Sequence, residues 1–129
     1  MDNERKGELT LLIKNKKIKL LFGMLFWKFL QDLGVKLQDL EHKLSDDQNP
    51  LGVFDTIAKI IYSAGWVAAK KEGKEFKYTE DEIFEWFEDD ITQQDIQMIV
   101  EGMMNSRILG KSLNDGIVRG KKTPKKTKK

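Results

Sequence analysis

The sequence predicts a mainly α-helical fold of the α+β class. An N-terminal β-hairpin leads into a compact bundle of about five helices, and a disordered basic tail follows. Three observations predict this fold: two short apolar runs flank a polar turn, apolar residues recur at helical spacing over most of the chain, and lysines dominate the C-terminal end. We therefore expect a flexible N-terminus (1–7), a single globular domain (8–110) and a disordered tail (111–129).

The hairpin is predicted over residues 8–22. Glu-Leu-Thr-Leu-Leu-Ile and Ile-Lys-Leu-Leu-Phe are the two apolar runs, and the polar Lys-Asn-Lys-Lys between them forms a turn centred on Asn15. Asparagine suits such a turn because it adopts positive φ more readily than other residues with a side chain, apart from glycine. An isolated hairpin is only marginally stable in water, so we expect this one to pack on the helices.

Two helices are predicted between residues 24 and 44. The first has apolar residues at helical spacing from Met24 to Leu33 and stops at Gly34. The second is an amphipathic run from Val35 to Leu44. The turn-forming segment 45–50 then interrupts the pattern, and we expect the chain to change direction there.

A long central helix is predicted over residues 51–71, because apolar residues cover one face and extend around a second side. Gly65 lies inside it, where glycine costs about 1 kcal/mol relative to alanine. This cost suggests that a neighbouring element approaches the helix closely at Gly65.

The last two predicted helices share a start signal. Thr79 precedes Glu82 by three residues, and Thr92 precedes Asp95 by three, the spacing at which both side chains can satisfy free backbone N–H groups. We expect the first of these helices to bury Ile83, Phe84 and Phe87, with Trp86 at the margin, and to stop near residues 89 and 90. The second should end near Gly110.

Charge is unevenly distributed in a chain whose formal net charge is only +2. Residues 111–129 hold eight lysines and arginines and one acid, a net charge of +7, which leaves −5 for the rest of the chain. Electrostatics therefore separates the chain into an acidic body and a basic tail. The composition of the tail is compatible with three roles: contact with nucleic acid, a charged end that aids solubility, or a flexible connector to an acidic partner. Its candidate electrostatic residues are Lys121, Lys122, Lys125, Lys126, Lys128 and Lys129.

Nothing in the sequence indicates an enzyme, a cofactor or a metal. The absence of cysteine excludes disulfides, thiolate nucleophiles and cysteine zinc sites. His42 is the only histidine and is expected on an exposed helical face, and no glycine-rich phosphate loop is present. The acids of 80–90 are most simply a solvated helical face.

We expect a cytoplasmic protein without membrane contact. The N-terminal residues lack the apolar core of a signal peptide, and charge interrupts the longest apolar stretch short of the roughly 20 residues that a bilayer span requires. The C-terminal tail has no aromatic residue to stack on bases, so any nucleic-acid binding should be non-specific.

The order of these elements and their residue patterns resemble those of the tail assembly chaperones of long-tailed bacteriophages. The resemblance covers residues 8–109 and is carried by a hairpin ending at Gly23, Leu33-Gly34, an Ile-, Ala- and Tyr-containing helix over 57–65, and the element 78–87. The sequence departs from the family pattern at the turn, where Asn15-Lys16 replaces Asn-Gly.

The resemblance implies a non-catalytic morphogenesis factor of the host cytoplasm. Such a factor binds the tape measure protein, keeps that long helical chain soluble and recruits tail tube subunits. Self-association is also compatible with this sequence. An apolar surface between the last two helices and the hairpin could hold partner helices in a groove. The candidate contacts are Trp86, Phe87, Met103 and Met104; core packing is the alternative role for these side chains.

Two other functions are compatible with the same sequence. One is a small nucleic-acid-associated protein that uses its basic tail, whose binding should weaken steeply as salt rises. The other is a structural virion subunit, such as a head-to-tail joining or tube protein. A chaperone should be absent from mature particles, whereas a structural subunit should be present.

Overall fold

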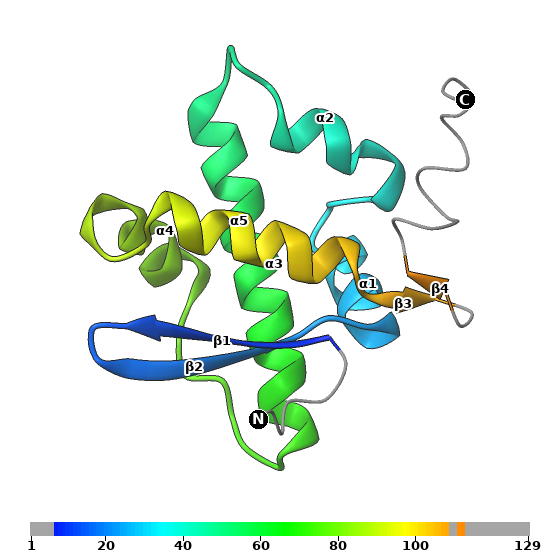
Figure 1. The fold of residues 1–129 in the computed structure, drawn as a ribbon, viewed down its shortest axis with the longest axis vertical. Helices are drawn as coiled ribbons and strands as arrows, with labels where there is room; N and C mark the ends of the chain where they lie inside the picture. Colours follow the sequence, from blue (N-terminus) through cyan, green and yellow to red (C-terminus); the bar gives the residue numbers. More distant parts are fainter. Residues whose placement is uncertain (1–6, 109–110, 113–129) are drawn as a thin grey trace.

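The computed structural model describes residues 7–108 and 111–112, and the side chains of residues 7–106 (Figure 1). Nearly all of the predicted flexible N-terminus, and residues 113–129 with the six candidate tail lysines, lie outside the described residues. The described part confirms the predicted fold class, an N-terminal hairpin followed by five α-helices. In order, the elements are β1 (Glu8–Ile13), β2 (Lys16–Leu21), α1 (Met24–Asp32), a 3-10 turn (Leu37–Asp39), α2 (Leu40–Leu44), α3 (Pro50–Lys71), α4 (Glu80–Asp89), α5 (Gln93–Met104), β3 (Arg107–Ile108) and β4 (Lys111–Ser112).

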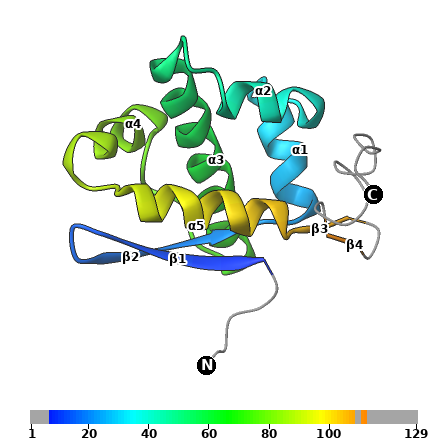
Figure 2. The same cartoon turned by 45° about the horizontal axis from the view of Figure 1, so that its top comes forward.

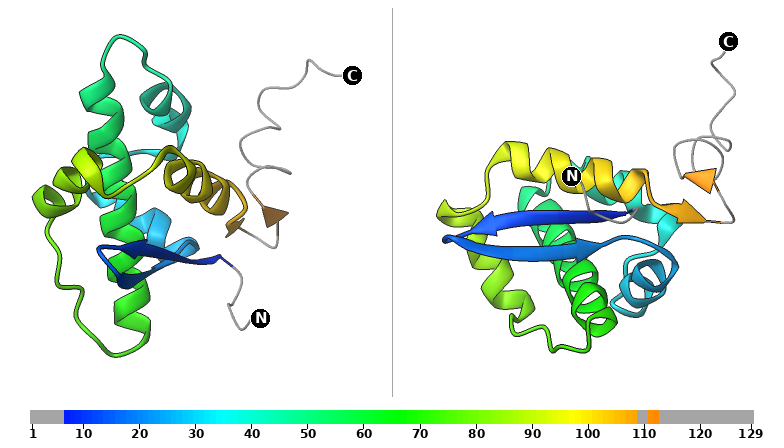
Figure 3. Two further views of the ribbon diagram at one scale, coloured as in Figure 1. Left: turned by 60° about the vertical axis from the view of Figure 1, so that its left-hand side comes forward. Right: turned by 60° about the horizontal axis from the view of Figure 1, so that its bottom comes forward.

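Helix α3 is the centre of the arrangement. The hairpin crosses its C-terminal half, α1 and α2 lie along one side, and α4 lies on the other (Figures 1 and 2). Helix α5 runs along β1, on the side away from β2 (Figure 3). The core therefore forms where the inner face of the hairpin, α1 and the last two helices meet α3.

The hairpin has the predicted turn. Strands β1 and β2 pair antiparallel in a register that places Ile13 opposite Lys16, which leaves a two-residue loop. Lys14 and Asn15 both have positive φ, 54° and 67°, as a type I′ turn requires. Alternate residues such as Leu11 and Ile18 point into the core.

Helix α3 is long and apolar because it is buried on several sides. Among the described residues it is the one helix with the length and hydropathy to cross a membrane, yet 56% of its most apolar window lies inside the protein. Burial in the core accounts for this composition. The predicted close approach at Gly65 is confirmed, because the ring of Phe76 occupies the space that a side chain there would need.

Both predicted helix caps are present. Thr79 accepts a hydrogen bond from the Glu82 backbone N–H (3.1 Å), and the Glu82 carboxylate accepts one from the Thr79 backbone N–H (2.8 Å). Thr92 and Asp95 make the same pair of bonds at the start of α5. Each cap satisfies two N–H groups that the first turn would leave without a partner.

Two predicted boundaries are wrong. Residues 35–44 do not form one continuous helix, because a 3-10 turn separates Val35 from α2. Helix α5 ends at Met104 instead of near Gly110, and Arg107–Ile108 pairs antiparallel with Lys111–Ser112. The helix ends early because the Ser106 hydroxyl donates a hydrogen bond to the Met103 carbonyl and is itself held by α1.

Replacing Gly65 with alanine should destabilise the protein. In an open helix this change is worth about 1 kcal/mol of added stability. Here the new methyl group would displace the Phe76 ring, and overpacking of this kind costs about 1–3 kcal/mol. Urea unfolding monitored by circular dichroism measures the difference. In a Phe76→Ala background the same substitution should become stabilising, and a gain in stability in the wild-type background would contradict the predicted close contact.

Candidate functional site

The structure separates the four predicted contact residues into two groups. Trp86 and Met103 are buried, with 5% and 0% of their surface exposed, so their assignment as direct partner contacts is wrong. Trp86 packs edge-on against Tyr78, with ring centroids 5.2 Å apart. Phe87 and Met104 are half-buried and remain accessible.

The reason for this correction is the rotation of α4. The predicted inner face contained Ile83, Phe84 and Phe87, whereas the structure buries Ile83 and Trp86 and leaves the two phenylalanines half-buried. Residues 86 and 87 lie at similar angles from Ile83 on a helix, so periodicity alone does not distinguish them. Tyr78, immediately before the helix, packs against Trp86 and favours its inward orientation.

The outward phenylalanines of α4 join an apolar surface on α3. Phe87 lies 5.1 Å from Phe54 and 6.3 Å from Phe84, measured between ring centroids. All three rings are half-buried, and Leu51, one helical turn before Phe54, is 66% exposed. We call Leu51, Phe54, Phe84 and Phe87 the phenylalanine patch. The sequence pattern did not single out Leu51 and Phe54 as contacts, because both belong to the apolar residues that predict the central helix.

Acidic side chains border the phenylalanine patch. Glu80 and Glu88 lie one turn before and after Phe84 on α4, and Asp55 follows Phe54 on α3. Lys59 pairs with Asp55 and Glu80, so this border holds three carboxylates and one ammonium group, a net charge of −2.

Lys59 joins the two helices that carry the patch. Its ammonium group lies 2.8 Å from the Asp55 carboxylate and 3.5 Å from that of Glu80. Partial burial on its own would lower the pKa of Lys59, but the hydrogen bond to Asp55 and the charges of Asp55 and Glu80 outweigh burial, and the net pKa is raised. Lys59 therefore links α3 to α4 through an ion pair.

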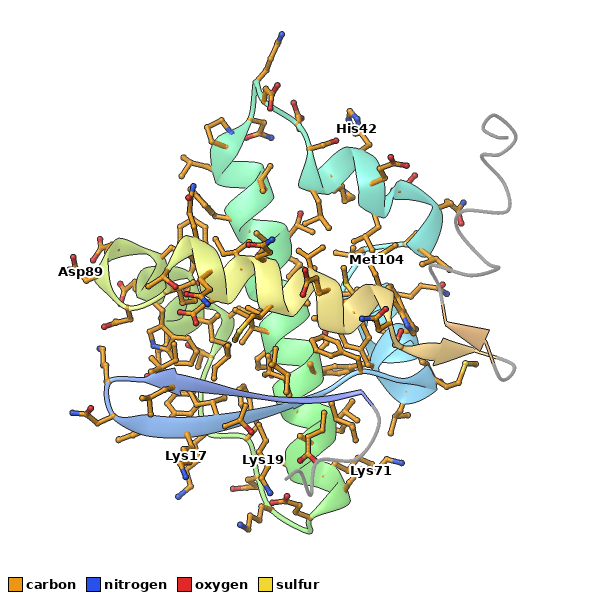
Figure 4. All side chains as sticks on the ribbon, in the orientation of Figure 1. Lys17, Lys19, His42, Lys71, Asp89 and Met104 are labelled. Atoms are coloured by element: carbon orange, nitrogen blue, oxygen red, sulfur yellow. The ribbon has the colours of Figure 1, made fainter. Side chains whose placement is uncertain are left out.

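A cavity of about 310 Å³ lies between the hairpin turn and α4. Carboxylates such as Glu85 and Asp89 line it, and Lys14 approaches Asp90 to 3.7 Å. Within the described part of the chain, no three histidine, aspartate or glutamate side chains are grouped so that they could hold a metal ion. His42 lies exposed on α2, away from Asp89 on α4 (Figure 4).

A buried hydrogen-bond relay fixes the end of α5 to α1. The Trp27 indole N–H donates to the Ser106 hydroxyl (2.9 Å), which donates in turn to the Met103 carbonyl (2.7 Å). Ser106 is fully buried. The relay holds in place the end of the helix that carries Met104.

Comparisons with protein-family models, with characterised proteins and with solved structures find no match for this chain. The likeness to tail assembly chaperones therefore stays a prediction from the sequence.

Replacing Ser106 with alanine should lower the free energy of unfolding by about 1–3 kcal/mol, because the buried Trp27 N–H loses its acceptor. The matched control is Ser63→Ala. Ser63 is equally buried, but its hydroxyl has no hydrogen-bond partner, so removing it should cost nothing or stabilise the protein. Denaturant unfolding of both variants gives the comparison. Equal losses would show that the Trp27–Ser106 bond contributes nothing.

Proposed function

We propose that this protein is a non-catalytic tail assembly chaperone that binds the tape measure protein and recruits tail tube subunits during phage tail assembly. The partly exposed phenylalanine patch with its acidic border carries the proposal. The resemblance in sequence supplies the identity of the partners, and the patch supplies a surface suited to a helical partner.

The patch has the chemistry of a surface that receives an amphipathic helix. Such helices present apolar side chains at intervals of three and four residues, and aromatic rings on the receiving side give large apolar contact area. Phe54 and Phe87 come from different helices and meet at 5.1 Å, so α3 and α4 together form one continuous apolar surface.

The acidic border restricts which helices bind. Glu80, Glu88 and Asp55 favour a partner whose apolar face is flanked by lysine or arginine, and they disfavour acidic helices. An aggregation-prone chain with such helices would stay soluble while its apolar faces are covered. This is the physical task of a chaperone for a long helical protein.

The proposal predicts that Leu51→Asp weakens the complex with the tape measure protein encoded in the same genome. Burying a leucine at an interface is worth about 1.5–3 kcal/mol, so we expect at least a roughly tenfold loss of affinity and less soluble tape measure protein on co-expression. Leu51 is 66% exposed, so the substitution should leave the fold intact.

Leu12→Asp is the matched control, because Leu12 is 61% exposed but lies on β1, outside the patch. It should bind and solubilise the partner as the wild type does. Equal effects of both variants would contradict the role of the patch. Finding the protein in stoichiometric amounts in mature particles would instead support a structural virion subunit. An affinity for nucleic acid that requires residues 111–129 and weakens as salt rises would support a small nucleic-acid-associated protein.

A further inference from the structure

A second surface lies on the side of the hairpin facing the end of α3. It is positively charged, in contrast to the acidic border of the phenylalanine patch. A groove of about 560 Å³ lies between β2 and the irregular segment 74–78, with Gly65, Ala68 and Ala69 among the residues that line it. Four lysines and two glutamates line it, which leaves a net charge of +2: Lys17, Lys19, Lys74 and Lys77, with Glu72 and Glu75. Figure 4 shows Lys17, Lys19 and Lys71 at this end of the molecule, well separated from His42 at the other. We call this surface the basic groove.

Part of the positive charge in the groove is already paired. Lys19 lies 2.7 Å from the Glu72 carboxylate, and Lys74 lies 3.6 Å from it. The hydrogen bond from Lys19 and its charge lower the pKa of Glu72, which favours the ionised carboxylate. Within the described residues, no ion pair involves Lys17 or Lys77, and both are exposed. The groove therefore keeps positive charge for an incoming anionic group.

Helix α4 is negatively charged and so complements the positive charge of the basic groove. Its ten residues contain six acids and no base. Glu82, Glu85 and Asp89 are all exposed and lie on one flank of the helix, because they are spaced by three and four residues. We call them the acidic stripe. Phe84 and Phe87 face the other flank, so the acidic stripe is distinct from the phenylalanine patch.

We propose that two copies of this chain form a two-fold dimer in which the acidic stripe of each lies in the basic groove of the other. The groove wall formed by 74–78 leads directly into the Thr79 cap and α4, so the two surfaces are neighbours on one molecule. Neighbouring complementary surfaces allow each contact to be made twice around one axis, which closes the assembly at two copies. A second copy of the chain suits the basic groove because its α4 carries negative charge. This inference does not depend on the proposed chaperone function.

Charge reversal on each surface tests the dimer. Lys17→Glu/Lys77→Glu makes the groove acidic, and Glu85→Lys/Asp89→Lys makes the stripe basic. All four side chains are exposed and lie outside the Thr79–Glu82 cap, so both variants should fold, which circular dichroism checks. We expect the wild type to dimerise in low salt and to dissociate as salt rises. Each variant alone should dimerise at least tenfold more weakly.

An equimolar mixture of the two variants should restore the dimer, since an acidic groove then meets a basic stripe and a basic groove meets an acidic one. Sedimentation equilibrium measures all four states. Lys28→Glu/Lys36→Glu is the matched control, because it makes the same change in net charge at exposed lysines away from the groove and should dimerise like the wild type.

Three results would overturn the dimer. One is a wild type that stays monomeric in low salt at high concentration. The second is a mixture that stays monomeric although both variants are folded. The third is a groove variant with unchanged self-association that loses affinity for a single-stranded oligonucleotide, which would make the groove a nucleic-acid surface instead.

Discussion

Burial of α3 by elements on several sides is the constraint on which the rest of the structure depends. The hairpin, α1 and α4 each bring an apolar face that is too small to be stable alone, and α3 supplies the common surface that completes their burial. Its own composition follows from this position. Small residues such as Gly65 and Ala68 allow close approach on the side where Phe76 and the hairpin pack.

A chain of aromatic contacts extends this packing from α1 to α4. Phe29 stacks on Trp66 of α3 and also approaches Tyr62, and Tyr62 contacts Phe76 in the connection that follows α3. Phe76 then meets Tyr78, and Tyr78 meets Trp86. Edge-on and stacked ring pairs contribute beyond their buried area. The contacts therefore fix the path of the irregular segment 74–78 and, through it, the rotation of α4.

That rotation gives α4 three different faces. Ile83 and Trp86 enter the core, Phe84 and Phe87 complete an apolar patch with α3, and Glu85 and Asp89 form part of an acidic flank. One short helix thus contributes to stability, to the proposed helix-binding surface and to the proposed dimer contact. Charge beside the half-buried phenylalanines restricts which partners can approach them.

The sequence by itself determined the features that depend on local physics. The Asn15 turn, both threonine caps, the close approach at Gly65 and the hairpin-plus-helices fold class all follow from backbone preferences or helical periodicity. Only the tertiary structure decided that Trp86 is buried while Phe87 is accessible, because that choice depends on Tyr78. The early end of α5 likewise depends on Trp27, 79 residues away from Ser106. Both surfaces proposed for binding combine residues from separate elements, and their proximity arises only on folding.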